Sequence, residues 1–267
     1  MTVQRKKNTT INVFDDSVLL FPLGKLGGYK SQGFCDVGEH LDGDRFVLTL
    51  AHAYNDLKDL FLWWEINREM APSQPPAGKL DKRFGQSCGI DSHVFRLMSG
   101  WLVEARVLLR SQKIVIENGL FADTIAKLDE KAMTSWRSLC EFSWSDDATL
   151  NKNLTELRTY LVKVRSDGTF HYEYVKPLAQ GFVSHFADPS KPESSYAFAT
   201  YGKNLEESRF LFGDAAITAM CGNMADGQLV KFQNTLTAYL RDSHFSFRAV
   251  VKKYMAKRGF AYHCLES

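Results

Sequence analysis

The chain has 267 residues, of which 45% are hydrophobic and 24% are charged. This is the composition of a folded globular protein, and it excludes a low-complexity or disordered chain. With 33 basic against 31 acidic residues, the chain also lacks the strong basic surplus of proteins that bind nucleic acid non-specifically.

The compartment can be argued from the cysteines and from the apolar segments. The five cysteines are scattered and never form a C-x-x-C pair, which argues against a disulfide scaffold or a zinc knuckle. No apolar run approaches the roughly 18 residues that a membrane span needs. We therefore expect a cytoplasmic protein that has no membrane partner.

The first residues of the chain show no helical period. Residues 1–41 are rich in glycine, and we expect an irregular N-terminal segment there. Two apolar pieces within it, residues 11–14 and 17–23, are candidates for a short hairpin. The remaining residues, 42–267, are predicted to form a helical domain.

In this domain, apolar side chains recur at intervals of three and four residues, as in amphipathic helices. The pattern predicts long helices over residues 46–64, 98–116, 125–142, 150–164 and 232–254. Prolines and glycines predict a loop over residues 71–89, and Asp91 and Ser92 follow it as candidate N-caps of the second helix.

A further helix is expected to begin between Phe170 and Val175 and to end before Asp188. Residues 195–202 and 208–213 are the least helical part of the domain, and they are candidate strands of a small insertion near 190–212. The predicted fold class is therefore all-α: a bundle of five or more long helices with a small irregular or hairpin insertion.

The strongest chemical signal lies between the helix predicted over residues 150–164 and the next one, which begins between Phe170 and Val175. Arg165 lies at the end of one helix, and His171 lies beyond a Ser-Asp-Gly break. RNA can be cut without a metal when its 2′-hydroxyl attacks the adjacent phosphate. That reaction needs a group that titrates near neutrality, which histidine supplies. It also needs a cation that stabilises the transition state, which arginine supplies.

The spacing of Arg165 and His171, within the sequence VRSDGTFHYEY of residues 164–174, resembles the R-x(4–6)-H motif of the HEPN superfamily. The resemblance implies an all-helical domain that acts as a metal-independent endoribonuclease, as in toxin–antitoxin and defence systems. It implies no cofactor and no metal. It also implies a homodimer in which two motifs meet, with RNA and an antitoxin or another protein as further partners.

The same resemblance implies roles for individual residues. His171 would act as general acid and base, and Arg165 would stabilise the transition state. Ser166, Asp167 and Tyr172 would contact the RNA. Ser166 departs from the family pattern, which usually has Asn, Asp or His after the arginine.

Two other Arg–His pairs have a similar spacing but a different context. Arg45 and His52 lie inside one predicted helix, whose helical period begins near Gly43, and packing explains them. Arg258 and His263 lie near the end of the chain, where fraying is expected. The remaining histidines have no partner at metal-ligand spacing and are interpreted as structural: His40, His93, His185 and His244.

Two other classes of function remain open. The first is a catalytically silent, all-helical module that forms dimers or binds a protein partner. The second is a small-molecule pocket between helices, lined by Trp63, Trp64 and Trp101. For these tryptophans, packing in the core is the stronger interpretation.

Overall fold

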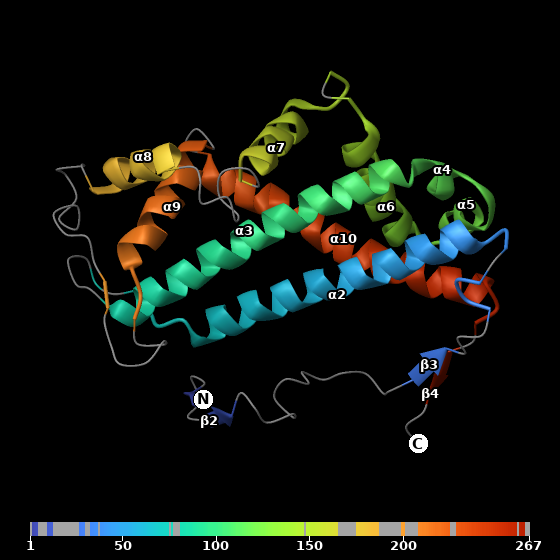
Figure 1. The fold of residues 1–267 in the computed structure, drawn as a ribbon, viewed down its shortest axis with the longest axis horizontal. Helices are drawn as coiled ribbons and strands as arrows, with labels where there is room; N and C mark the ends of the chain where they lie inside the picture. The colour runs from blue at the N-terminus through green and yellow to red at the C-terminus, as the bar shows by residue number, and fades with distance from the viewer. Residues whose placement is uncertain are drawn as a thin grey trace. The chain divides into compact units, whose positions relative to one another are not determined.

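The computed structural model describes residues 2–4, 10–12, 27–29, 33–36, 38–74, 76, 81–146, 148–164, 175–186, 199–200, 208–224, 228–260 and 262–264. The chain divides into two compact units. The first contains residues 1–58, 105–145 and 239–267, and the second contains residues 59–104 and 146–238. Three long helices contribute residues to both units (Figure 1): α2 (Leu41–Met70), α3 (Lys82–Ser111) and α10 (Leu229–Lys257).

The all-α prediction is confirmed. The part of the chain that the structure describes holds nine helices, and its strands form only two short pairs and one isolated bridge. The other six helices are α4 (Lys113–Glu117), α5 (Gly119–Ile125), α6 (Glu130–Trp144), α7 (Lys152–Lys163), α8 (Val175–Phe186) and α9 (Leu211–Met224).

The core of the first unit is built around aromatic rings. The ring of Phe121 lies 5.0 Å from Phe46 of α2, 6.2 Å from Trp136 of α6 and 5.6 Å from Tyr254 of α10, measured between centroids. All four side chains are buried. Removing such large apolar surfaces from water is the main stabilising term of this unit.

A buried carboxylate holds the two ends of the first unit together. Asp44, at the start of α2, is fully buried. It accepts hydrogen bonds from the Tyr254 hydroxyl at 2.8 Å, from Arg258 Nε and Nη2 at 2.9 Å each, and from the Cys35 backbone N–H at 3.1 Å. Arg258 Nη2 also donates to the Gly33 carbonyl at 2.9 Å. The fraying expected at Arg258 is therefore wrong, because the guanidinium makes three hydrogen bonds to two groups far from it in sequence, the Asp44 carboxylate and the Gly33 carbonyl.

The strands are short and lie near the ends of the chain. Strand β3 (Gly27–Tyr29) pairs antiparallel with β4 (Tyr262–Cys264), which contains His263 (Figure 1). Strand β1 (Thr2–Gln4) pairs antiparallel with β2 (Thr10–Asn12). The sequence predicted instead that residues 11–14 pair with residues 17–23. Residues 17–23 lie outside the described part of the chain.

Amphipathic helices bury their apolar sides in the core of the second unit, as the stripes predict. Leu154, Leu157 and Leu161 of α7 are buried, together with Phe232 of α10 and Leu102 of α3. The Asn151 side chain caps α7 by accepting a hydrogen bond from the Leu154 N–H at 3.1 Å. This confirms the helix predicted at 150–164, and helix α8 begins at Val175, the later of its two predicted starts.

Helix α3 begins at Lys82, nine residues before its predicted cap at Asp91. Asp81 starts it, since its carboxylate accepts from the Arg83 N–H at 2.8 Å. The loop prediction for residues 71–89 is therefore wrong over the second half of that range. Gly89, which looked like a loop residue, lies inside the helix, and the side chains of Arg209 and Asp214 occupy the space that a Cβ at this position would need.

The stripes at 98–116 and 125–142 do not form one helix each. Helix α3 ends at Ser111, and the short helices α4 and α5 follow, separated by Asn118 in an extended conformation. Helix α6 then begins at Glu130, with the Asp129 carboxylate accepting from the Ala132 N–H at 2.8 Å. The apolar positions of the stripe at 98–116 are buried as predicted, whereas Ile125 and Leu128 of the next stripe are half-buried. The break near Asn118 was predicted, but the breaks at Gln112 and at residues 126–129 were not.

Helix α9 was not predicted. Its sequence, LFGDAAITAMCGNM, is apolar and small on nearly every side and so shows no stripe with a 3.6-residue period. The second candidate strand, residues 208–213, runs into this helix at Leu211. Of the predicted hairpin, the described residues show one antiparallel bridge, between Thr200 and Arg209.

Helices α8 and α9 pack closely at Gly181 (Figure 1), where a Cβ would overlap the Ala216 carbonyl oxygen and lie 2.8 Å from the Met220 nitrogen. Because these are backbone atoms, we expect Gly181→Ala to lower the free energy of unfolding by about 1–3 kcal/mol. The matched control is Gly222→Ala in α9, where nothing lies within 4 Å of the added Cβ. Ala should be neutral there or stabilise by up to about 1 kcal/mol. Urea denaturation of both variants measures the difference, and equal midpoints would contradict this packing.

Candidate functional site

The residues predicted to form the catalytic site lie outside the described part of the chain: Arg165, Ser166, Asp167, His171 and Tyr172. The structure does describe both flanks. Helix α7 ends at Lys163, with Val164 as its buried C-cap, and helix α8 begins at Val175. The motif therefore follows α7 and precedes α8 in the sequence.

The exposed face of α7 leads up to the motif. Leucines bury one side of this helix, so the residues at intervals of four, three and four on the other side face solvent. They are Lys152, Glu156, Thr159 and Lys163. The face thus carries two lysines, the second of them two residues before Arg165.

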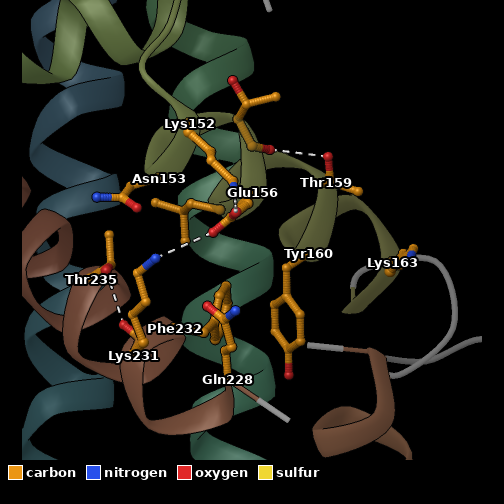
Figure 2. A pocket seen from close by; sticks show the side chains of 12 residues that line it. Lys152, Asn153, Glu156, Thr159, Tyr160, Lys163, Gln228, Lys231, Phe232 and Thr235 are labelled. Carbon is orange, nitrogen blue, oxygen red and sulfur yellow. Dashed lines mark hydrogen bonds and ion pairs between the residues drawn. The ribbon is translucent and has the colours of Figure 1, made fainter. Parts of the chain in front are cut away.

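A cleft lies between this face of α7 and the start of α10 (Figure 2). Its volume is about 380 Å³. Helix α7 contributes Lys152, Asn153, Thr155, Glu156, Leu157, Thr159, Tyr160 and Lys163, and the other wall is Gln228, Lys231, Phe232 and Thr235. Most of the lining side chains end in an amide, a hydroxyl or a charged group, although apolar atoms make up the larger part of the surface exposed in the cleft.

The charged groups of the cleft are three lysines and one glutamate. Glu156 lies between two of the lysines (Figure 2), with its Oε2 3.4 Å from Lys231 Nζ and its Oε1 3.9 Å from Lys152 Nζ. Lys163 lies at the other end of the cleft, beyond Tyr160. The net charge of +2 favours an anion, and each ammonium has three N–H groups, so Lys152 and Lys231 keep donors beyond those aimed at Glu156.

The floor of the cleft is aromatic and buried. The rings of Tyr160 and Phe232 lie 3.5 Å apart between centroids, and both side chains are less than 8% exposed. The Tyr160 hydroxyl donates to the Cys221 carbonyl at 3.2 Å. Burial, together with the neighbouring Cys221, raises the pKa of Tyr160. Tyr160 is therefore a neutral, structural group and no proton donor or acceptor for a reaction.

A second basic cluster joins α3 to α9 within the second unit. Arg209 pairs with Asp214 through two contacts, at 2.7 and 3.2 Å, and lies against Gly89 of α3. One turn along, Arg96 Nη2 lies 3.3 Å from His93 Nδ1. Burial lowers the pKa of His93, as do Arg96 and Arg209, while Asp214 opposes them. A neutral His93 that accepts from Arg96 fits its predicted structural role.

Two further histidines have aromatic neighbours that fit their predicted structural role. His244 stacks on Tyr54 with centroids 4.7 Å apart, and His185 meets the edge of Phe186. His52 is exposed and 3.7 Å from Asp56, so packing does not explain it as expected. Among the described residues, no group of three His, Cys, Asp or Glu side chains could hold a metal ion.

The tryptophan pocket gains no support. Trp63 is 57% exposed, and Trp64 is half-buried under the guanidinium of Arg68, 5.3 Å from the ring centroid. Core packing, the stronger interpretation of these residues, is wrong for Trp63. Within the described ranges, no helix combines the length and the hydropathy that crossing a membrane would require.

Comparison with known proteins gives no relative. No family model matches the chain, and no curated protein or solved structure is significantly similar to it. The HEPN resemblance thus rests on residues 164–174 and on the helical layout, and it stays a prediction.

The sequence predicted the motif but not the cleft between α7 and α10. The exposed positions of α7 were readable from its stripe, and Lys152 and Lys163 were there to be seen. The opposite wall was not readable, because Gln228 and Lys231 are some 70 residues further along the chain. Only packing of α7 against α10 brings them together.

Proposed function

We propose that this protein is a HEPN-like, metal-independent endoribonuclease that acts in the cytoplasm as a toxin or defence component. Its catalytic residues are Arg165 and His171. Ser166, Asp167 and Tyr172 contact the RNA. An antitoxin or another protein would be its natural partner.

The observation that carries this proposal is where α7 ends. The helix stops at Lys163, and its last two turns line a cleft with a net charge of +2. A polyanionic substrate would be attracted to this end of α7, beside the position of Arg165 in the chain. A histidine that transfers protons and an arginine that stabilises the transition state of phosphodiester cleavage are useful only where such a substrate binds.

In the proposed reaction, the RNA 2′-oxygen forms a bond to the adjacent phosphorus, and the bond from phosphorus to the 5′-oxygen breaks. A proton leaves the 2′-hydroxyl and a proton reaches the departing 5′-oxygen, and His171 carries out this transfer. Arg165 offers a planar fork of N–H donors to the phosphorane oxygens, whose negative charge grows in the transition state. No metal or cofactor takes part.

One Arg–His pair is a sparse site, and we propose that two copies meet across the two-fold axis of a homodimer. A substrate strand would then contact both motifs. The alternative, a catalytically silent helical module, uses the same surface to dimerise or to bind a protein. The two differ in whether the purified protein cuts RNA.

The test is to incubate purified protein with single-stranded RNA of mixed sequence in the presence of EDTA. We expect cleavage to continue, because the mechanism uses no metal, and we expect the 5′ fragments to end in a 2′,3′-cyclic phosphate by mass spectrometry. A 2′-O-methyl strand of the same sequence should stay intact because it lacks the attacking hydroxyl. Cleavage of that strand, loss of activity in EDTA, or an inactive protein would refute the proposal.

A further inference from the structure

We infer that the cleft between α7 and α10 binds the phosphate backbone of a single RNA strand. The inference rests on the proposed function, and it names the substrate class and the residues that hold it. The binding groups are Lys152, Lys163 and Lys231.

The charges and their spacing favour a strand over a small anion. Lys152 and Lys163 are eleven residues apart on one helix face, which separates their Cα atoms by about 16 Å at 1.5 Å per residue. Lys231 faces them from α10 (Figure 2). Successive phosphates of an extended strand can contact ammonium groups spread over such a length, whereas one phosphate cannot.

Glu156 has a clear part in this arrangement. Its carboxylate lies within 4 Å of both Lys152 and Lys231, so it holds the two ammonium groups near each other when no strand is bound. All three side chains are at least 42% exposed, and such pairs contribute little to stability in water. A phosphate can therefore compete for the lysines, and Glu156 opposes that binding by its charge.

The shape and the floor of the cleft define the kind of nucleic acid. A volume of about 380 Å³ lies at the low end of the roughly 300–1,000 Å³ typical of small-ligand sites, so it admits a segment of one strand. An A-form duplex presents its phosphates on a rigid, wide surface. The rings of Tyr160 and Phe232 are buried beneath the polar walls, so they offer no stacking platform. Recognition should therefore depend on salt and tolerate any sequence.

The experiment measures binding apart from cleavage. A fluorescent 12-nucleotide 2′-O-methyl RNA, which the proposed reaction cannot cut, is titrated with full-length protein at several salt concentrations. Replacing Lys152, Lys163 and Lys231 by Gln should weaken binding about tenfold or more at low salt. It should lower the slope of log Kd against log salt by about 2, because three contacts are lost on a single strand.

Two matched variants separate anion binding from a structural role. The triple variant of Lys127, Lys252 and Lys253 to Gln makes the same charge change at exposed positions of the first unit and should bind like the wild type. Glu156→Gln should tighten binding severalfold. Because Glu156→Gln and Lys231→Gln both break the same ion pair, a structural role would move the two variants in the same direction.

Each result decides between the readings. The inference is supported if Glu156→Gln binds the strand more tightly than the wild type and the triple variant of Lys152, Lys163 and Lys231 binds it more weakly. It is overturned if the wild type does not bind the strand, if the two lysine triples bind alike, or if a 12-base-pair duplex binds as tightly as the single strand. A wild type that binds through these lysines but cuts no RNA would refute the ribonuclease and leave the binding site standing. If the wild type cuts RNA but the cleft lysine triple binds the strand as tightly as the wild type does, the binding site is refuted and the ribonuclease stands.

Discussion

Replacing His171 by alanine should reduce the rate of RNA cleavage by about 100- to 10,000-fold, the usual contribution of a general acid or base. The thermal stability of the protein should change little, because a catalytic side chain positioned for RNA is exposed. Substitutions at exposed positions usually change the free energy of unfolding by no more than about 0.5 kcal/mol. Single-turnover cleavage of a labelled RNA strand and a thermal melt of the same sample measure the two effects.

Arg165 should respond to a conservative change almost as strongly as to a severe one. Lysine keeps the positive charge but loses the planar fork that contacts two phosphorane oxygens together. We therefore expect Arg165→Lys to be nearly as inactive as Arg165→Ala. If lysine restored most of the activity, a general electrostatic role would replace the proposed one.

The chain provides its own control for this experiment. Arg45 and His52 have a similar spacing, but both are exposed on α2, with Asp42 and Asp56 as their neighbours. Arg45→Lys and His52→Ala should leave cleavage unchanged. Two results together would contradict the catalytic role of His171. The wild type would cut no RNA, and His171→Ala would lower the free energy of unfolding by about 1–3 kcal/mol. That combination would identify His171 as a buried structural group and end the ribonuclease hypothesis.

The second large effect is expected at Asp44. Removing one partner of a buried ion pair leaves the other charge without compensation and costs about 3–5 kcal/mol. Asp44→Asn keeps the size of the side chain but removes the charge that Arg258 and the Tyr254 hydroxyl both bond. We expect it to lower the free energy of unfolding at pH 7 by an amount in this range, measured by urea denaturation. Arg45→Gln, which breaks an exposed pair with Asp42, should change it by less than about 1 kcal/mol.

The effect of Asp44 should depend on pH. Burial would raise the pKa of this carboxyl, but the bonds from Arg258, Cys35 and Tyr254 outweigh it and hold the pKa below its ordinary value of 3.8. A carboxyl whose pKa is lower in the folded state contributes stability above its unfolded pKa and loses it as the pH falls through the folded pKa. The wild type should therefore lose its advantage over Asp44→Asn below about pH 4. A difference between them that is constant from pH 7 to pH 2.5 would contradict this assignment.

Much of the fold could be read from local patterns. The leucines at 150, 154, 157 and 161 predicted α7 because an apolar residue every three or four positions can be buried only on one face of a helix. The α10 stripe from Phe232 to Tyr254 was predicted for the same reason. What local patterns could not give were the breaks at Gln112 and at residues 126–129. An apolar stripe marks which positions are buried. It continues across a break when the helical segments before and after the break pack against the same core.

The failures at α3 and α9 have a shared physical cause. Gly89 resembled a loop residue, but it is a contact point where Arg209 and Asp214 come close to the backbone of α3. In α9, Gly181 of α8 packs against the backbone at Ala216, and small residues on every side leave no stripe. Close packing between helices selects small residues, and these are the residues that local rules assign to turns.

The candidate site divides in the same way. The sequence alone predicted that Arg165 and His171 stand at the junction between two helices, since that prediction depends on the ends of two stripes, and both this position and their catalytic role stay predictions. Tertiary structure alone decided that Lys231 lies 3.4 Å from Glu156, and that Arg258 near the end of the chain bonds Asp44 near its beginning. Spacing along a helix is set by its 3.6-residue period and can be read from residues a few positions apart. Contacts between helices depend on which faces meet, and no neighbouring residue carries that information.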